Sequence, residues 1–197
     1  MTFWGITRLE EEGQDDEVPL VEAQAEGEAT RAESRHLMIL RFGHSCIAPG
    51  DPAALAEKQQ LVIETHRARG ALASLVSVPA SLAMDPGLEP RLRAFLSTAQ
   101  KAKARIAFDF GRAGAPRWLD DFESRVFDPL WFREQAPVAG IWKIHGWHPE
   151  RWVRLYPESD LRLLVKLARR HRPSAVILAH SQRLAQWRRI QELLAQG

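Results

Sequence analysis

The sequence predicts an α/β protein built on a mostly parallel sheet. From Leu37 to the C-terminus, short apolar runs that are typical of buried strands alternate with longer segments that carry helix signals. This alternation favours β-α-β units, in which successive strands run parallel and helices cover the sheet. The chain has 197 residues, of which 45% are hydrophobic and 26% charged, and this suits one globular domain. A closed eight-stranded α/β barrel usually needs about 250 residues.

The predicted strands are the short apolar runs that end at a Gly, a Pro or a polar residue. They are residues 37–42, 72–78, 105–110, 138–145 and 175–179.

Four helices are predicted between and after these strands. The first begins at Asp51-Pro52, with Asp as the cap and Pro at the first position, and it ends near Gly70. Its inner face is marked by Leu55, Leu61, Val62 and Thr65. The other helices are residues 90–101, 159–172 and 182–195. Residues 116–136 are aromatic and irregular, and we expect a helix to begin at Pro116.

The first 36 residues are strongly acidic. They hold ten acidic and three basic residues, for a net charge of −7, whereas the rest of the chain carries +9. An acidic stretch with few apolar residues buries too little surface to offset the entropy of ordering it. We therefore expect a largely flexible segment over 1–36, mobile over about 9–34, and an α/β domain over 37–197. Two alternatives stay open: the acidic arm folds onto a basic face of the chain or of a partner, and Phe3–Ile6 docks as a strand or anchors another chain.

Several classes of protein are excluded. No apolar run approaches the roughly 20 residues needed to cross a bilayer. The first eight residues lack a basic region followed by an apolar core, so we expect no secretory signal and a cytoplasmic protein. The single cysteine, Cys46, excludes an internal disulfide and a cysteine-based metal site. The chain has no glycine-rich phosphate loop, no G-x-S-x-G and no H-E-x-x-H, and we expect no cofactor.

The last two predicted strands carry a resemblance to a known family. Residues 141–146 read Ile-Trp-Lys-Ile-His-Gly, and an aromatic segment at 152–156, a helix and a strand ending in His180-Ser181 follow. This order is similar to the C-terminal part of the YecE-like family, an uncharacterised family with an α/β-barrel fold. Its members show Arg-x-His-Gly, a Trp-Tyr loop, a helix and a strand ending in Phe-Asn-Asn. Further upstream similarities lie at residues 75–81, 89–95 and 107–112, with a weaker one at 39–44.

The chain also departs from this family. The acidic segment stands in place of the family's first two strands, and residues 116–136 stand in place of a later strand. His145 and Gly146 match the family outright. The family's Gln, Glu, Arg and Asn-Asn correspond to Ser77, Asp109, Lys143 and His180-Ser181. The resemblance therefore implies an incomplete or eroded TIM-type (β/α) barrel with about five to six strands.

Polar residues at the predicted strand ends form the candidate site. Ligands of parallel α/β folds bind where the carboxyl ends of strands and the N-termini of helices converge. Asp109 or a histidine suits the role of base, and Lys143 with Arg112 suits the role of anion clamp. The catalytic candidates are Asp109, Lys143, His145 and His180, and the ligand-binding candidates are Ser77, Arg112 and His44. The alternative for each residue is a cap or a loop hydrogen bond.

Other chemistries have less support. His145 and His148 with His180 and Asp109 offer ligand types that zinc accepts, but the two histidines do not lie on one helix face, and we expect no metal. Ser45-Cys46 is more typical of a small buried pair than of a nucleophile. Residues 141–197 carry a net charge of +7 with interleaved tryptophans, a combination that is compatible with nucleic-acid binding but does not favour it. The alternative is a solvated helix face, because Arg162, Lys166, Arg169 and Arg170 fall largely on one side of a predicted helix.

These observations favour a partner-binding or assembly protein derived from a YecE-like barrel, with a vestigial or modified pocket. We expect the missing strands to leave an unpaired edge and an aromatic surface that meet a second subunit or an unrelated protein, and no membrane. The aromatic residues are Trp118, Phe122, Phe127, Trp131 and Phe132. The competing expectation is that they fold inward. The alternative function is a small-molecule enzyme acting on an anionic ligand at the strand ends, and the third is a nucleic-acid accessory protein.

Overall fold

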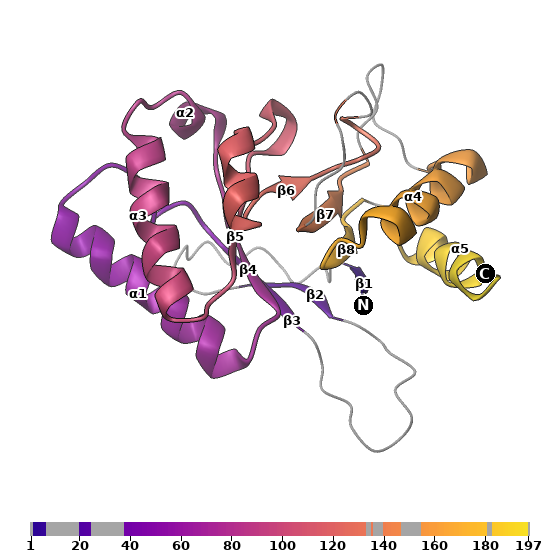
Figure 1. The fold of residues 1–197 in the computed structure, drawn as a ribbon, viewed down its shortest axis with the longest axis horizontal. Coiled ribbons are helices and arrows are strands. Elements are labelled where there is room, and N and C mark those ends of the chain that lie inside the picture. The colour runs from indigo at the N-terminus through magenta and orange to yellow at the C-terminus, as the bar shows by residue number, and fades with distance from the viewer. Residues whose placement is uncertain are drawn as a thin grey trace. The chain divides into compact units, whose positions relative to one another are not determined.

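The chain forms two compact units. The computed structural model describes residues 2–6, 20–24, 38–132, 135, 140–146, 155–180 and 183–196. The N-terminal unit is Arg8–Arg125, and the C-terminal unit combines Met1–Thr7 with Val126–Gly197. Figure 1 shows the elements of both units in chain order. The boundary at residue 36 that the acidic composition suggests stays a prediction.

The N-terminal unit is built on a parallel sheet with one antiparallel strand. The parallel strands are β3 (Met38–Phe42), β4 (Ala73–Ser77) and β5 (Ile106–Asp109), in that order across the sheet. β2 (Leu20–Gln24) pairs antiparallel with β3. α1 (Pro52–Arg69) and α3 (Leu88–Lys101) connect the parallel strands and lie on the same face of the sheet (Figure 1). Three short helices complete the unit: α2 (Ala80–Ala83), η1 (Gly111–Ala113) and η2 (Arg117–Phe122).

The core of this unit lies between the sheet and the two long helices. Val76 pairs in register with Phe42 on one side and Phe108 on the other, and all three side chains are buried. Phe95 of α3 packs edge-on against Phe108, with ring centroids 6.1 Å apart. Successive residues of a strand point to opposite faces of the sheet, so these side chains share one face.

The ends of α1 are those that the sequence predicts. The Asp51 carboxylate accepts a hydrogen bond from the Ala54 N–H at 2.9 Å, and Pro52 takes the first position. Gly70 ends the helix with φ 58°, a left-handed conformation that costs glycine little. Cap and stop signals are local, so the sequence alone locates these boundaries.

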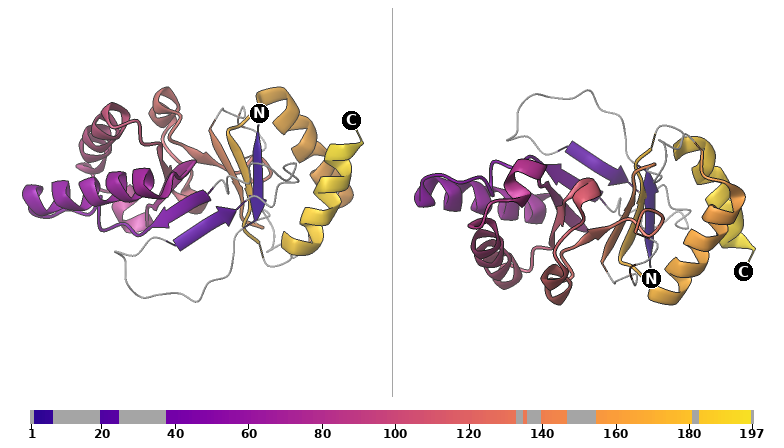
Figure 2. Two further views of the ribbon diagram at one scale, coloured as in Figure 1. Left: turned by 90° about the horizontal axis from the view of Figure 1, so that it is seen from below. Right: turned by 90° about the horizontal axis from the view of Figure 1, so that it is seen from above.

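The C-terminal unit has an all-parallel sheet covered by two helices. Its strands are β1 (Phe3–Ile6), β8 (Ala175–Leu178), β7 (Ile141–Ile144) and β6 (Val126–Phe127), in that order across the sheet. α4 (Glu158–His171) and α5 (Arg183–Ala195) lie side by side against one face (Figure 2). Trp142, Ile144, Val176 and Leu178 meet the apolar stripe of α4 at Leu161, Leu164, Val165 and Ala168.

The five predicted strands and the four predicted long helices are confirmed, with the parallel pairing expected within each unit. The helix expected from Pro116 is a short 3-10 helix, η2. β1 adopts the strand conformation that was one alternative for Phe3–Ile6. Leu20–Gln24, inside the stretch 9–34 that was expected to be mobile, form β2 and pair with β3. The mobility of that stretch stays a prediction, and its other residues lie outside the described ones. Backbone pairing along a strand edge satisfies N–H and C=O groups whatever the side chains are.

The number of strands differs from the five to six that the sequence suggests, because β1, β2 and β6 add to the predicted five. The described strands do not form a barrel of eight parallel strands, since β2 runs antiparallel to β3. No described helix is long and apolar enough to span a membrane.

The aromatic residues of 116–136 do not form one exposed surface. Trp118 and Phe122 pack against the core of the N-terminal unit, with ring centroids 6.1 Å apart. Phe127 is buried in the C-terminal unit, where it stacks on Phe132 at 5.7 Å. Trp131 is half-buried beside Phe132. Phe127 is therefore folded inward, and Trp118, Phe122 and Phe132 are partly buried against the core of their own unit.

Candidate functional site

Polar residues gather where two strands of the C-terminal unit end. Asp128 directly follows β6, His145 directly follows β7, and Lys143 is the third residue of β7. β6 and β7 are parallel neighbours, with Phe127 in register with Trp142. Their carboxyl ends therefore meet at one edge of the sheet, which is where α/β proteins place ligands.

The Asp128 carboxylate links the chain after β6 to the chain after β7 by hydrogen bonds. Its side chain is 1% exposed. Oδ1 accepts the backbone N–H of Leu130 at 3.0 Å and of Trp131 at 3.2 Å, and Oδ2 accepts the backbone N–H of His145 at 3.0 Å. One carboxylate thus shapes the turn after β6 and joins it to the end of β7.

The same carboxylate faces the imidazole of His145. Oδ2 of Asp128 lies 3.5 Å from Nδ1 of His145, a distance at which a protonated ring forms an ion pair. The His145 side chain is 14% exposed although its Nδ1 atom is buried. The accessible part of the ring is therefore the part away from Asp128. A carboxylate behind Nδ1 favours the tautomer with the proton there, which leaves Nε2 as the basic nitrogen.

Lys143 lies on the same face of β7 as His145. Trp142 and Ile144 point into the apolar core under α4, so the alternating residues Lys143 and His145 project to the opposite face. The Lys143 side chain is buried, at 5% exposure. A cation, an imidazole and a carboxylate thus lie on one sheet edge, and such a set can bind an anionic group and transfer a proton.

His180 lies two residues after β8, the strand that pairs with β7. Its ring is buried and meets Tyr156 edge-on, with centroids 5.6 Å apart, among the apolar residues under α4 and α5. Its carbonyl accepts hydrogen bonds from the backbone and the guanidinium of Arg183, at 3.1 and 3.3 Å, where α5 begins. These contacts connect the end of β8 to α5. Ile144 is in register with Leu178, so His180 follows the strand next to that of His145, and its imidazole packs on Tyr156.

Two more candidates meet in the N-terminal unit. Ser77 and Asp109 are register partners at the ends of β4 and β5. Ser77 Oγ accepts a hydrogen bond from Nε of Arg41 on β3 at 3.2 Å, and Asp109 accepts the N–H of Gly111 at 2.9 Å. Arg41, Ser77 and Asp109 thus follow one another across β3, β4 and β5 of the N-terminal unit. Lys143 and His145 belong to the C-terminal unit.

The remaining candidates are exposed loop residues of the N-terminal unit. His44 lies in the loop after β3, and Arg112 lies in η1 after β5. Among the described residues, no group of three or more His, Cys, Asp or Glu side chains is placed to hold a metal ion. His148, a member of the metal set considered from the sequence, lies outside the described residues.

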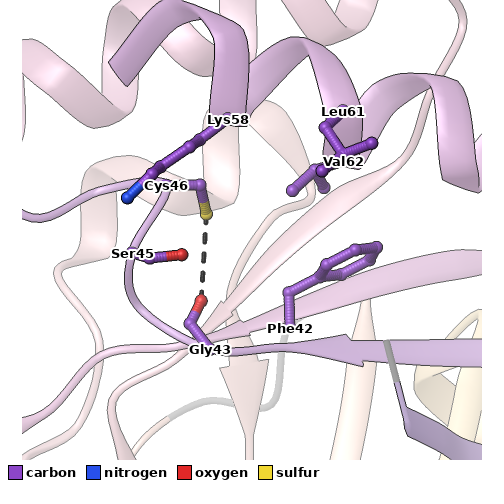
Figure 3. A pocket seen from close by; sticks show the side chains of 7 residues that line it. All are labelled: Phe42, Gly43, Ser45, Cys46, Lys58, Leu61 and Val62. Carbon is purple, nitrogen blue, oxygen red and sulfur yellow. Dashed lines mark hydrogen bonds between the residues drawn. The ribbon is translucent and has the colours of Figure 1, made fainter. Parts of the chain in front are cut away.

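Cys46 lines a small cavity of about 20 Å³ beside α1 (Figure 3). The thiol is buried and its Sγ lies 3.8 Å from the carbonyl oxygen of Gly43. Burial raises the pKa of Cys46 to about 12, although Lys58 nearby opposes this shift. The thiolate that a nucleophile requires is therefore scarce at neutral pH. The burial predicted for Cys46 is confirmed, whereas Ser45 is half-buried.

Sequence reasoning missed Asp128 and Arg41. Asp128 precedes Pro129, and Asp-Pro is a turn signal that marks the end of an element. The preceding strand has only two residues, Val126 and Phe127, too few to show a strand period. Arg41 is the one charged residue of a predicted apolar strand, and its contact with Ser77 of the next strand has no signal in the sequence.

Comparisons of this chain with protein-family models, with curated proteins and with solved structures found no match.

Proposed function

We propose that this chain binds an anionic small molecule at the ends of β6 and β7, with His145 as the residue that exchanges a proton with it. The observation that carries the proposal is the placement of Asp128 Oδ2 3.5 Å from Nδ1 of His145. The carboxylate faces Nδ1 of the ring and stabilises the imidazolium that forms when Nε2 takes up a proton. Lys143, on the same face of β7, supplies the positive charge that attracts a carboxylate or a phosphate.

The placement of these groups suits proton transfer. Asp128 has its position fixed by three backbone N–H groups, so it does not reorganise when a ligand arrives. His145 follows a buried strand and precedes Gly146, which has a left-handed φ of 80°. A rigidly held imidazole on the same strand face as a buried lysine suits general acid–base chemistry on an anionic substrate.

Titration of the full chain with inorganic phosphate and, separately, with malonate tests this proposal. The imidazole proton resonances of His145 should shift in a saturable way with the anion that the site binds, phosphate or the dicarboxylate malonate. Those of His171 should not shift. Lys143→Gln should weaken the binding, whereas Lys101→Gln, an exposed lysine on α3, should not. Shifts at His145 no larger than those at His171 with either anion would contradict the proposal, and so would unchanged binding by Lys143→Gln.

We also propose that the chain is a divergent relative of the YecE-like family with an incomplete TIM-type barrel. Two observations support this: helices follow parallel strands in both units, and His145-Gly146 ends a strand as the family motif does. The positive φ of Gly146 explains why a glycine follows the histidine. An experimental structure in which residues 141–146 are not a strand followed by this turn would remove the support.

Binding to a second subunit or to another protein, and the third function as a nucleic-acid accessory protein, stay predictions. The inward packing of Phe127 and Phe132 removes part of the aromatic surface from which partner binding was inferred. Sedimentation of the full chain at micromolar concentration tests self-association directly, since a single monomeric species excludes a stable dimer under those conditions.

A further inference from the structure

A groove lies on the outer side of the helix layer of the C-terminal unit. Its volume is about 340 Å³, and it is bounded by α4 and by the C-terminal end of α5. Figures 1 and 2 both show these two helices running beside each other. The groove is lined by Arg162, Val165, Lys166, Arg169, Leu193 and Gln196. Three of these six residues are basic and none is acidic.

The three cations form a row along one face of α4. Residues 162, 166 and 169 are spaced at i, i+4 and i+7, which places them on neighbouring turns of the same side. With a rise of about 1.5 Å per residue, the row spans about 10 Å. All three side chains are exposed, as expected for the outer face of this helix.

The ends of the row are held in position. Arg169 donates hydrogen bonds to the carbonyl oxygens of Leu193 and Leu194, at 3.3 and 3.1 Å, where α5 nears its C-terminus. Arg162 pairs with Glu158 one turn earlier, at 2.8 Å. Between them, Lys166 makes no ion pair with any residue that the structure describes. The centre of the groove therefore offers a positive charge that is available to an external anion.

We propose that this groove binds an acidic peptide segment of a partner protein. Side chains on one face of an extended peptide repeat every 6–7 Å or so, which is close to the separation of about 6 Å along α4 between Arg162 and Lys166. Alternate Asp or Glu residues can therefore face successive cations, and arginine clusters recognise acidic motifs in this way. Val165 and Leu193 form an apolar floor between the charges.

A protein segment suits this surface better than a nucleic acid does. Single-stranded nucleic acids are held by aromatic side chains on which bases stack, as well as by basic residues. None of the six residues that line the groove is aromatic. The proposal is independent of the strand-end site, because the groove involves only α4 and α5 and none of Asp128, Lys143 or His145.

The test is a fluorescence-anisotropy titration of the full chain with a short labelled peptide in which Glu alternates with Ser. Measurements at about 0.15 M salt exclude weak attraction between distant charges. Lys166→Glu should weaken binding by about fivefold or more, as expected when an exposed attraction becomes a repulsion. Arg170→Glu is the matched control, because it makes the same charge change on the same helix outside the groove lining.

Three outcomes would overturn the proposal. The first is an absence of peptide binding at that salt concentration. The second is an equal loss of affinity in Lys166→Glu and Arg170→Glu, which indicates attraction to the net charge and no defined groove. The third is tighter binding of a labelled single-stranded oligonucleotide that Lys166→Glu abolishes, which assigns the surface to nucleic acid. Circular dichroism of both variants checks that the exposed substitutions leave the fold unchanged.

Discussion

Replacing Asp128 by Ala should lower the free energy of unfolding by about 3 kcal/mol or more. The carboxylate accepts three backbone N–H groups, from Leu130, Trp131 and His145, and is 1% exposed. A hydrogen bond to a charged acceptor contributes about 1.5–3 kcal/mol, and a buried donor left without an acceptor costs about 1–3 kcal/mol. Water can reach the turn at Trp131, which is half-buried, so the three contributions do not add in full.

Asp128→Asn tests the contributions of the two carboxylate oxygens separately. The amide oxygen can still accept the N–H groups of Leu130 and Trp131, whereas the amide nitrogen then faces the N–H of His145, and two donors oppose each other. We expect about half the loss caused by Asp128→Ala. If the amide binds in the opposite orientation, the His145 contact survives and the turn after β6 is weakened.

Urea unfolding followed by circular dichroism measures these losses. For a chain of this size a loss of 3 kcal/mol corresponds to a fall of about 6–12 °C in Tm. Asp121→Ala, an exposed aspartate of η2, is the control and should change neither quantity. A loss below about 1 kcal/mol for Asp128→Ala would refute the reasoning, because an uncompensated buried donor costs at least that much.

Three further predictions concern other parts of the two cores. Phe132→Ser should destabilise the fold by about 2–4 kcal/mol, because Phe132 stacks on buried Phe127; a variant that stays folded but loses self-association in sedimentation would favour the exposed surface instead. Burial lowers the pKa of His66, whose Nε2 accepts the Arg105 N–H at 3.3 Å and whose Nδ1 lies 3.1 Å from Ser74 Oγ. Neutral His66 therefore stabilises the fold fully above the ordinary pKa of about 6.5, and this stabilisation is lost as the pH falls below it. Urea titrations at pH 7.5 and 5.5, or thereabouts, should show a smaller pH dependence for His66→Gln than for the wild type; an equal dependence would contradict the burial. Cys46 should resist iodoacetamide in the folded state and react only in denaturant, because its pKa is about 12 and it is buried; rapid alkylation of the native protein would show that the loop around it opens.

Local signals located most of the regular structure. Asp51, Pro52 and Gly70 bound α1 because cap hydrogen bonds and a left-handed stop depend only on neighbouring residues. Arg162, Lys166, Arg169 and Arg170 of α4 are all exposed, which fits the solvated helix face that the sequence offered as one alternative. The inner face of α1 was predicted less well, since Leu61 is 45% exposed while His66 is buried. His66 lies inside because Ser74 and the Arg105 N–H satisfy its nitrogens, and no helical period reveals those partners.

Local patterns in the chain predict the alternation of strands and helices, the mostly parallel pairing and the placement of Lys143 and His145 at a strand end. The tertiary fold determines which strand ends are neighbours, because pairing joins residues far apart in the chain. It placed Asp128 beside His145, assigned Asp109 to the other unit, and paired Leu20–Gln24 with β3 inside an acidic segment. The physical reason is that capping and periodicity act over a few residues, whereas a buried carboxylate or an added strand is stabilised by backbone donors and acceptors that only the folded chain brings together.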